Sequence, residues 1–303
     1  MKTNRHATTF ISMGLALCAF ALFTSHQANA VKPQKKAKKL LVVTVTKGFR
    51  HDSIPVAEEV IQRLGEESKA FETDFVRTDE DMAQKMTAEA LKNYDAIVFA
   101  NTTGVLPIPN ANALLDFVKS GKGFVGMHSA SDTFHTWPGS TDAISPYVKM
   151  LGAEFLTHHA QCEVDPFIAD PKHPALKAVA EAAKEYNPAT SAKVDLRKGT
   201  SPEGSVWKGF DEIYILKNVD RENLHLLLRL DKYPNDGSKE ANEPGEHLIS
   251  WCKAYGKGRV FYTSYGHRKE MWLDAHYRKH ILGGILFALG VEKGSTKPTP
   301  LAK

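Results

Sequence analysis

The chain has 303 residues, of which 42% are apolar, and it carries 39 Lys and Arg against 35 Asp and Glu. At roughly 150 residues per domain, this length predicts one or two globular domains. The net charge of +4 is too small for the strong positive field that attracts nucleic acids, so no nucleic-acid partner is expected.

The first thirty residues have the pattern of a secretory signal peptide. Lys2 and Arg5 precede an apolar run from Phe10 to Phe23, and Ala28-Asn29-Ala30 supplies the small-x-small pattern of a cleavage site. The run is shorter than the ~20 residues of a membrane-spanning helix. We therefore expect cleavage after Ala30 and a periplasmic or secreted protein without stable membrane insertion. The alternative is an uncleaved membrane anchor.

Removing residues 1–30 leaves 273 residues, which we divide into a basic lead-in (31–38), one domain (39–291) and a C-terminal tail (292–303). Cys162 and Cys252 are the cysteines that remain, so one disulfide is possible in an exported protein. The sequence does not decide whether they pair, nor the number of subunits, and a homo-oligomer stays possible.

The first half of the domain alternates apolar runs with helical patterns. Strands are predicted in four such runs, at 38–46, 71–78, 94–102 and 123–128. Between them, residues 54–64 and 111–118 have apolar residues at helical spacing, and Gly121 stands where a helix C-cap is expected. This alternation indicates βαβ units and a mostly parallel sheet.

The second half has strand patterns with few helices. Strands are predicted within 162–170, 211–216, 224–231, 247–256 and 258–266. Loops are predicted at 181–204 and 231–245, and an amphipathic helix at 274–290. The fold class is therefore α/β, with one domain, a mostly parallel central sheet and an antiparallel-rich C-terminal elaboration.

Histidines follow three of the predicted strands. His51 lies in "KGFRHD", His128 in "GMHSASD" and His267 in "GHRKE". In parallel α/β sheets, ligands collect beyond the carboxyl ends of the strands. We therefore expect these three histidines to converge, with Asp132 and Glu270 close by.

Neutral imidazoles together with a carboxylate are typical ligands of zinc and similar divalent ions. The predicted metal ligands are His51, His128 and His267, with His158 or His159 as a weaker candidate. Adjacent side chains of a strand point to opposite faces, so at most one of that pair can face the site. The spacing matches no compact metal motif, and each histidine also has an ordinary structural interpretation. No nucleotide cofactor is expected.

Aromatic and polar residues flank the same loops and are predicted to bind a substrate. A sugar ring packs its C–H face on aromatic rings while its hydroxyls take hydrogen bonds. The predicted substrate-binding residues are Phe49, Arg50, Ser129, Phe134, Trp137 and Tyr265. Ordinary packing of the aromatic residues is the alternative.

The stretch "GKGFVGMHSASD" has the strand, turn and small residues of a nucleophile elbow, with His128 in the nucleophile position. Ser129 follows where hydrolases place an oxyanion-hole amide, so a serine hydrolase is the weaker alternative. Gly126 lets the turn approach the sheet, and Gly266 frees the backbone beside His267.

Several segments in this order resemble the ThuA (trehalose-utilisation) family: "VTVTKGFRHDSIP", "GKGFVGMHSASDTF", "FLTHHA", "DEIYIL", "YGKGRVFYTSYGH" and "HILGGILFALG". The resemblance extends from Lys39 to Gly290. It implies the fold of class I glutamine amidotransferases, a flavodoxin-like three-layer sandwich. In those enzymes the elbow bears a catalytic Cys and a late His-x-Glu completes the triad.

By that comparison, His128 occupies the nucleophile position, His267 lies near the triad histidine, and Glu270 is displaced by one residue. A glutaminase without its cysteine cannot form the thioester intermediate, so ammonia transfer is excluded.

The resemblance implies carbohydrate metabolism on disaccharides or their 3-keto derivatives. The resulting hypothesis is a glycoside-cleaving hydrolase or lyase with His128, His267, Asp132 and Glu270 as catalytic residues. A sugar-binding or scaffold protein without catalysis is the alternative.

Overall fold

The first strand, β1 (Lys38–Val43), shows why the sheet is enclosed on both faces. Leu40 to Val43 have no solvent exposure, so both faces of this strand must be covered by other elements. The computed structural model describes Met1, residues 36–186 and residues 207–300. The predicted signal peptide lies outside the described residues, and the chain from Lys36 onward forms one compact unit.

In the described part of the chain, eight strands form the central sheet in the order β2-β1-β3-β4-β12-β11-β10-β7. The first five pair in parallel in the 2-1-3-4-5 order of flavodoxin-like folds, and the last three add antiparallel pairs. The strands after β1 are β2 (Phe71–Val76), β3 (Ala96–Ala100), β4 (Gly123–Met127), β7 (Phe167–Ile168), β10 (His225–Lys232), β11 (Pro244–Tyr255) and β12 (Gly258–Thr263). The predicted α/β fold with a mostly parallel sheet and an antiparallel-rich second half is confirmed.

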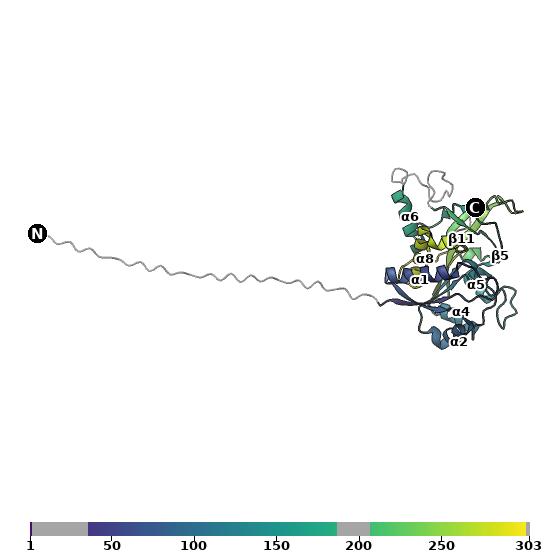
Figure 1. The fold of residues 1–303 in the computed structure, drawn as a ribbon, viewed down its shortest axis with the longest axis horizontal. Coiled ribbons are helices and arrows are strands. Elements are labelled where there is room, and N and C mark those ends of the chain that lie inside the picture. The colour runs from purple at the N-terminus through teal and green to yellow at the C-terminus, as the bar shows by residue number, and fades with distance from the viewer. Residues whose placement is uncertain (2–35, 187–206, 301–303) are drawn as a thin grey trace. The chain divides into compact units, whose positions relative to one another are not determined.

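Helices cover both faces of this sheet (Figure 1). One face packs against α1 (Ile54–Ser68), α6 (Pro174–Tyr186) and α8 (Ala275–Ala288), with the short α7 (Lys269–Leu273) beside them. The other packs against α2 (Asp79–Lys85), α3 (Ala88–Leu91), α4 (Ala111–Lys119) and α5 (Pro146–Leu151).

Local sequence signals fix several helix starts. Thr78, Asn110 and Asp274 cap α2, α4 and α8, each accepting a hydrogen bond from a backbone N–H in the first turn.

Two small sheets are inserted between the main strands and reach the site described below. β5 (Glu154–His158) pairs with β9 (Tyr214–Lys217), and β6 (Cys162–Val164) pairs with β8 (Gly209–Asp211). Short 3-10 turns at His128–Asp132 and Arg221–Asn223 complete the described elements.

The structure corrects two predictions about helices. Residues 181–186, predicted as a loop, continue α6, whose Ala-rich sequence has high helix propensity. The remainder of that predicted loop, 187–206, lies outside the described residues. The last helix is amphipathic only in its first half, because Gly283 to Ala288 are buried all round.

Specific contacts surround the described cysteines and the segment after α8. Cys162 and Cys252 are both free, and the Cys252 sulfur lies 3.6 Å from Nε2 of His173. The backbone of Thr299 bonds to Leu224, so the described part of the predicted tail packs on the domain. No helix among the described residues is long and apolar enough to cross a membrane.

His280 on α8 makes the stability of the domain depend on pH. Its ring is fully buried, Nδ1–H donates to the Ala175 carbonyl at 3.0 Å, and burial lowers its pKa from 6.5 to about 4. The unfolded state therefore takes up the proton first, and this stability, present above pH 6.5, is lost as the pH falls towards 4. The loss amounts to about 2 kcal/mol at pH 5.

We expect His280→Asn, which keeps an N–H donor, to make the free energy of unfolding fall less steeply between pH 7.5 and pH 5. Urea titrations of both proteins at the two pH values measure this. Equal slopes would contradict a neutral buried imidazole at this position.

Candidate functional site

His128 begins the turn that follows β4, and its backbone is strained. Its φ of 49° lies in the left-handed region, which side chains other than glycine rarely adopt and which often marks functional turns. Gly126 makes room for the turn, because a Cβ there would lie 2.9 Å from the Tyr262 ring and 3.3 Å from the Ala130 side chain. The Tyr262 hydroxyl also donates to the His128 carbonyl at 2.7 Å. The predicted elbow is therefore present, with a 3-10 turn after it.

The structure brings His51, His128 and His267 together. Nε2 of His128 lies 3.1 Å from Nε2 of His51, and one ring nitrogen of each of the three residues lies within 4.8 Å of the others. His128 is fully buried, His51 nearly so, and His267 is partly exposed. The three side chains lie in the loops after β1, β4 and β12. These strands are parallel, so their carboxyl ends lie at the same edge of the sheet.

Burial keeps two of these imidazoles neutral at neutral pH. It lowers the pKa of His51 to about 4 and that of His128 well below 6.5, and in each case a neighbouring histidine lowers it further. Nδ1 of His128 donates to the Ser264 carbonyl at 2.7 Å, so Nε2 carries the lone pair that faces His51.

Glu212 is the carboxylate of the cluster, and the sequence analysis did not find it. Oε2 lies 3.2 Å from Nδ1 of His267 and 3.7 Å from Nε2 of His128, while Oε1 lies 3.2 Å from Nδ1 of His158. The side chain is 8% exposed, and its charge raises the pKa of His267. The sequence signal for Glu212 was the acidic pair Asp211-Glu212 directly before an apolar strand. An acidic side chain that is buried beside such a strand needs a polar partner.

Asp211 holds the loop that carries His267. Its carboxylate accepts hydrogen bonds from the backbone N–H groups of Gly266, His267 and Arg268 at 2.6 to 3.2 Å. Gly266 has a φ of +124°, which only glycine adopts easily. Burial outweighs these bonds and raises the pKa of Asp211 to about 6.

Tyr214 and His158 close the site from the inserted strands. The buried Tyr214 hydroxyl donates to Nε2 of His128 at 2.9 Å. His158 faces Glu212, whereas His159 points elsewhere and bonds to Asp236 and Ser238. Of the predicted pair, the structure thus brings His158 alone to the cluster.

Asp132 lies at the end of the elbow turn and belongs to a second polar chain. Its Oδ1 lies 2.6 Å from Nε2 of His135, whose Nδ1 pairs with Glu154. These two carboxylates raise the pKa of His135. Asp132 is also close enough to raise the pKa of His51 by its charge.

Other predicted residues lie away from the cluster. Glu270, predicted as catalytic, is on the surface and pairs with Arg268. Glu212 therefore provides the carboxylate expected from Glu270. Arg50 is exposed and its guanidinium donates to the Thr44 carbonyl at 3.3 Å.

Of the predicted substrate-binding aromatic residues, Phe49 alone is exposed, and its ring lies edge-on to His51 at 4.8 Å. Phe134, Trp137 and Tyr265 are buried in the core, where a sugar ring does not reach them.

Ser129 is buried, and its Oγ lies 3.4 Å from Nδ1 of His51. The other nitrogen of His51 faces His128 instead of a carboxylate. This arrangement lacks the third group that orients the base in a serine hydrolase.

The parallel sheet and the histidines at its strand ends define an α/β protein with its candidate site at the carboxyl edge. Residues 39–288 match the family model named ThuA, trehalose utilisation. The chain therefore belongs to the ThuA family.

Two solved structures share the fold. A ThuA-like protein from Parabacteroides merdae ATCC 43184 has a TM-score of 0.62 at 18% identity, over 85% of this chain and 91% of that one. A ThuA-like protein from Bacteroides uniformis ATCC 8492 has a TM-score of 0.57 at 20% identity, over 88% and 98%. No curated protein matches the sequence.

Replacing Asp211 tests the support of the His267 loop. We expect Asp211→Ala to lower the free energy of unfolding by about 2–4 kcal/mol, because three backbone N–H groups lose their acceptor. Asp211→Asn keeps one oxygen and should lose less. Denaturant unfolding of the wild type and the two variants measures the order of their free energies of unfolding. Equal values would show that the carboxylate does not hold the loop.

Proposed function

We propose that this ThuA-family protein binds a divalent metal ion through His51, His128 and His267 and cleaves a disaccharide or 3-keto-glycoside. The observation that carries the proposal is the convergence of these three side chains within 4.8 Å. Family membership supports the carbohydrate substrate.

The donor set suits zinc or a similar ion. Two of the imidazoles are neutral at neutral pH, and Nε2 of His128 has a lone pair that would bind the ion in place of its hydrogen bond from the Tyr214 hydroxyl. Zinc–nitrogen bonds of about 2.0–2.1 Å need donors closer together than 4.8 Å, so the partly exposed His267 would move inwards. Glu212 is placed to be a fourth ligand or to orient His267.

The proposed chemistry uses the acidity of a carbon beside a ketone. A bound metal ion would polarise the ketone oxygen and stabilise the enolate. Asp132 takes the proton from the carbon next to the ketone, the electron pair forms a C=C bond, and the glycosidic C–O bond breaks. Asp132 then returns the proton to the leaving oxygen. Addition of water to the C=C bond completes a hydrolysis, and without it the reaction is an elimination.

Metal binding is testable without activity. We expect purified protein to hold about one equivalent of zinc or a similar ion by elemental analysis, and His51→Ala or His128→Ala to bind it at least ~10-fold more weakly. His276→Ala, a histidine outside the cluster, is the matched control and should retain the metal. Wild-type protein that stays metal-free after incubation with zinc would rule out the metal site.

The same preparations separate binding from catalysis. Asp132→Asn should keep the metal and lose turnover of a 3-keto-disaccharide by about 10²-fold or more. Metal and sugar binding without turnover by the wild type would instead support the binding-protein alternative. Covalent labelling of Ser129 by a fluorophosphonate would support the serine-hydrolase alternative.

We also propose that the protein is exported and acts in the periplasm or outside the cell. The N-terminal sequence pattern supports this. N-terminal sequencing of protein expressed in a Gram-negative host should give Val31 as the first residue. Recovery of uncleaved chain in the membrane fraction would favour the anchor alternative.

A further inference from the structure

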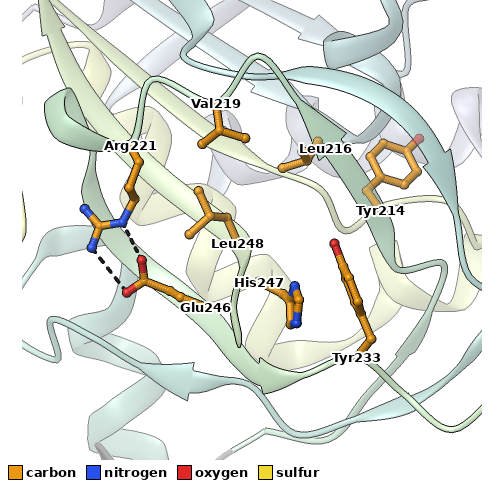
Figure 2. A pocket seen from close by; sticks show the side chains of 8 residues that line it. All are labelled: Tyr214, Leu216, Val219, Arg221, Tyr233, Glu246, His247 and Leu248. Carbon is orange, nitrogen blue, oxygen red and sulfur yellow. Dashed lines mark hydrogen bonds and ion pairs between the residues drawn. The ribbon is translucent and has the colours of Figure 1, made fainter. Parts of the chain in front are cut away.

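A pocket of about 270 Å³ lies between β9 and the β10–β11 hairpin (Figure 2), and none of the three clustered histidines lines it. It is lined by Tyr214, Leu216, Val219, Arg221, Tyr233, Glu246, His247 and Leu248. None of these residues was singled out by the sequence. We propose that this pocket is a binding site for one neutral pyranose ring.

One wall of the pocket is aromatic. The Tyr233 ring lies between His247, with centroids 3.4 Å apart, and His159, with centroids 4.4 Å apart. The surface left for a ligand is therefore the His247 ring together with Leu216 and Leu248. The C–H face of a pyranose packs on such a surface, as apolar ligand faces do on aromatic side chains in concave sites.

The same wall offers hydrogen-bonding groups without partners. The Tyr233 hydroxyl points into the space enclosed by the drawn residues and bonds to none of the described ones (Figure 2). His247 donates from Nε2 to the Glu243 carbonyl at 2.9 Å, which leaves its Nδ1 as an acceptor. A donor and an acceptor side by side match the hydroxyls of a sugar.

The charges of the pocket favour a neutral ligand. Arg221 and Glu246 form a two-point ion pair, with Nη2 3.2 Å from Oε2, so neither charge is left for a charged ligand. The guanidinium also donates to the carbonyls of Thr299 and Pro300, so the Glu246 oxygens are the groups of the pair that remain to accept from hydroxyls.

Tyr214 belongs to both sites. Its side chain lines the pocket, and its hydroxyl bonds to Nε2 of His128. Tyr214 therefore connects the pocket to the histidine cluster. The inference rests on the carbohydrate part of the proposed function and does not need a metal ion or turnover.

The test measures binding of methyl α-D-glucopyranoside by saturation-transfer NMR and calorimetry. We expect saturable binding, weakened about tenfold or more by Val219→Trp, which fills the pocket from its exposed rim, and by Tyr233→Phe, which removes one hydroxyl. Val291→Trp places the same ring at an exposed valine outside the pocket and should bind like the wild type. Circular dichroism confirms that each variant is folded.

The result with His128→Ala distinguishes the two sites. Retained binding in this variant supports the pocket even if the proposed metal site or activity fails. Binding lost in His128→Ala but kept in Val219→Trp would place the sugar at the histidines and overturn the inference. No saturable binding to the wild type, or tighter binding of glucuronate than of the neutral glycoside, would overturn it as well.

Discussion

The parallel pairing of β4 with β12 is the constraint on which the candidate site depends. Met127 pairs with Thr263, so the next residues of both strands, His128 and Ser264, leave the sheet side by side. The His128 ring then reaches the Ser264 carbonyl, and that bond fixes which nitrogen carries the lone pair. A one-residue shift in this register would turn His128 to the other face of the sheet.

Burial of the carboxyl edge of the sheet changes the protonation of its histidines. Removing His51 and His128 from water penalises their charged forms, so the cluster presents neutral nitrogens at a pH where exposed imidazoles are partly protonated. Glu212 places a buried carboxylate beside them, and a buried carboxylate is costly unless it has partners. Nδ1 of His158 and Nδ1 of His267, each 3.2 Å from one of its oxygens, meet that need, which ties the inserted strands to the main sheet.

The fold was predictable because strand periodicity and strand order obey local and topological rules. The runs at β1, β3 and β4 have no polar face, and the carboxyl-end rule placed His51, His128 and His267 together from their strand positions alone. The rule says nothing about insertions between strands. His158 and Tyr214 reach the site from β5 and β9, whose pairing joins residues more than fifty positions apart. Glu212 directly follows β8, whose partner β6 lies more than forty positions earlier in the chain.

Aromatic residues show the other limit of sequence reasoning. Phe134 and Trp137 lie close to the elbow in sequence, yet their rings pack under it against Tyr147. Phe210 was not predicted, although it is 48% exposed and its ring lies 4.9 Å from the Arg268 guanidinium, beside His267. Sequence distance from a site residue does not say to which side of the backbone a ring turns.

A histidine in the nucleophile position of the elbow changes the chemistry that this fold can support. A nucleophile elbow stores backbone strain in order to present one side chain at the sheet edge, and His128 retains that strain with a φ of 49°. Its imidazole does not project alone, because Ser264, Tyr214 and His51 all contact it. A side chain held from three directions is a poor covalent nucleophile, which must move towards its substrate. The left-handed turn and these three contacts therefore fix the position of the ring.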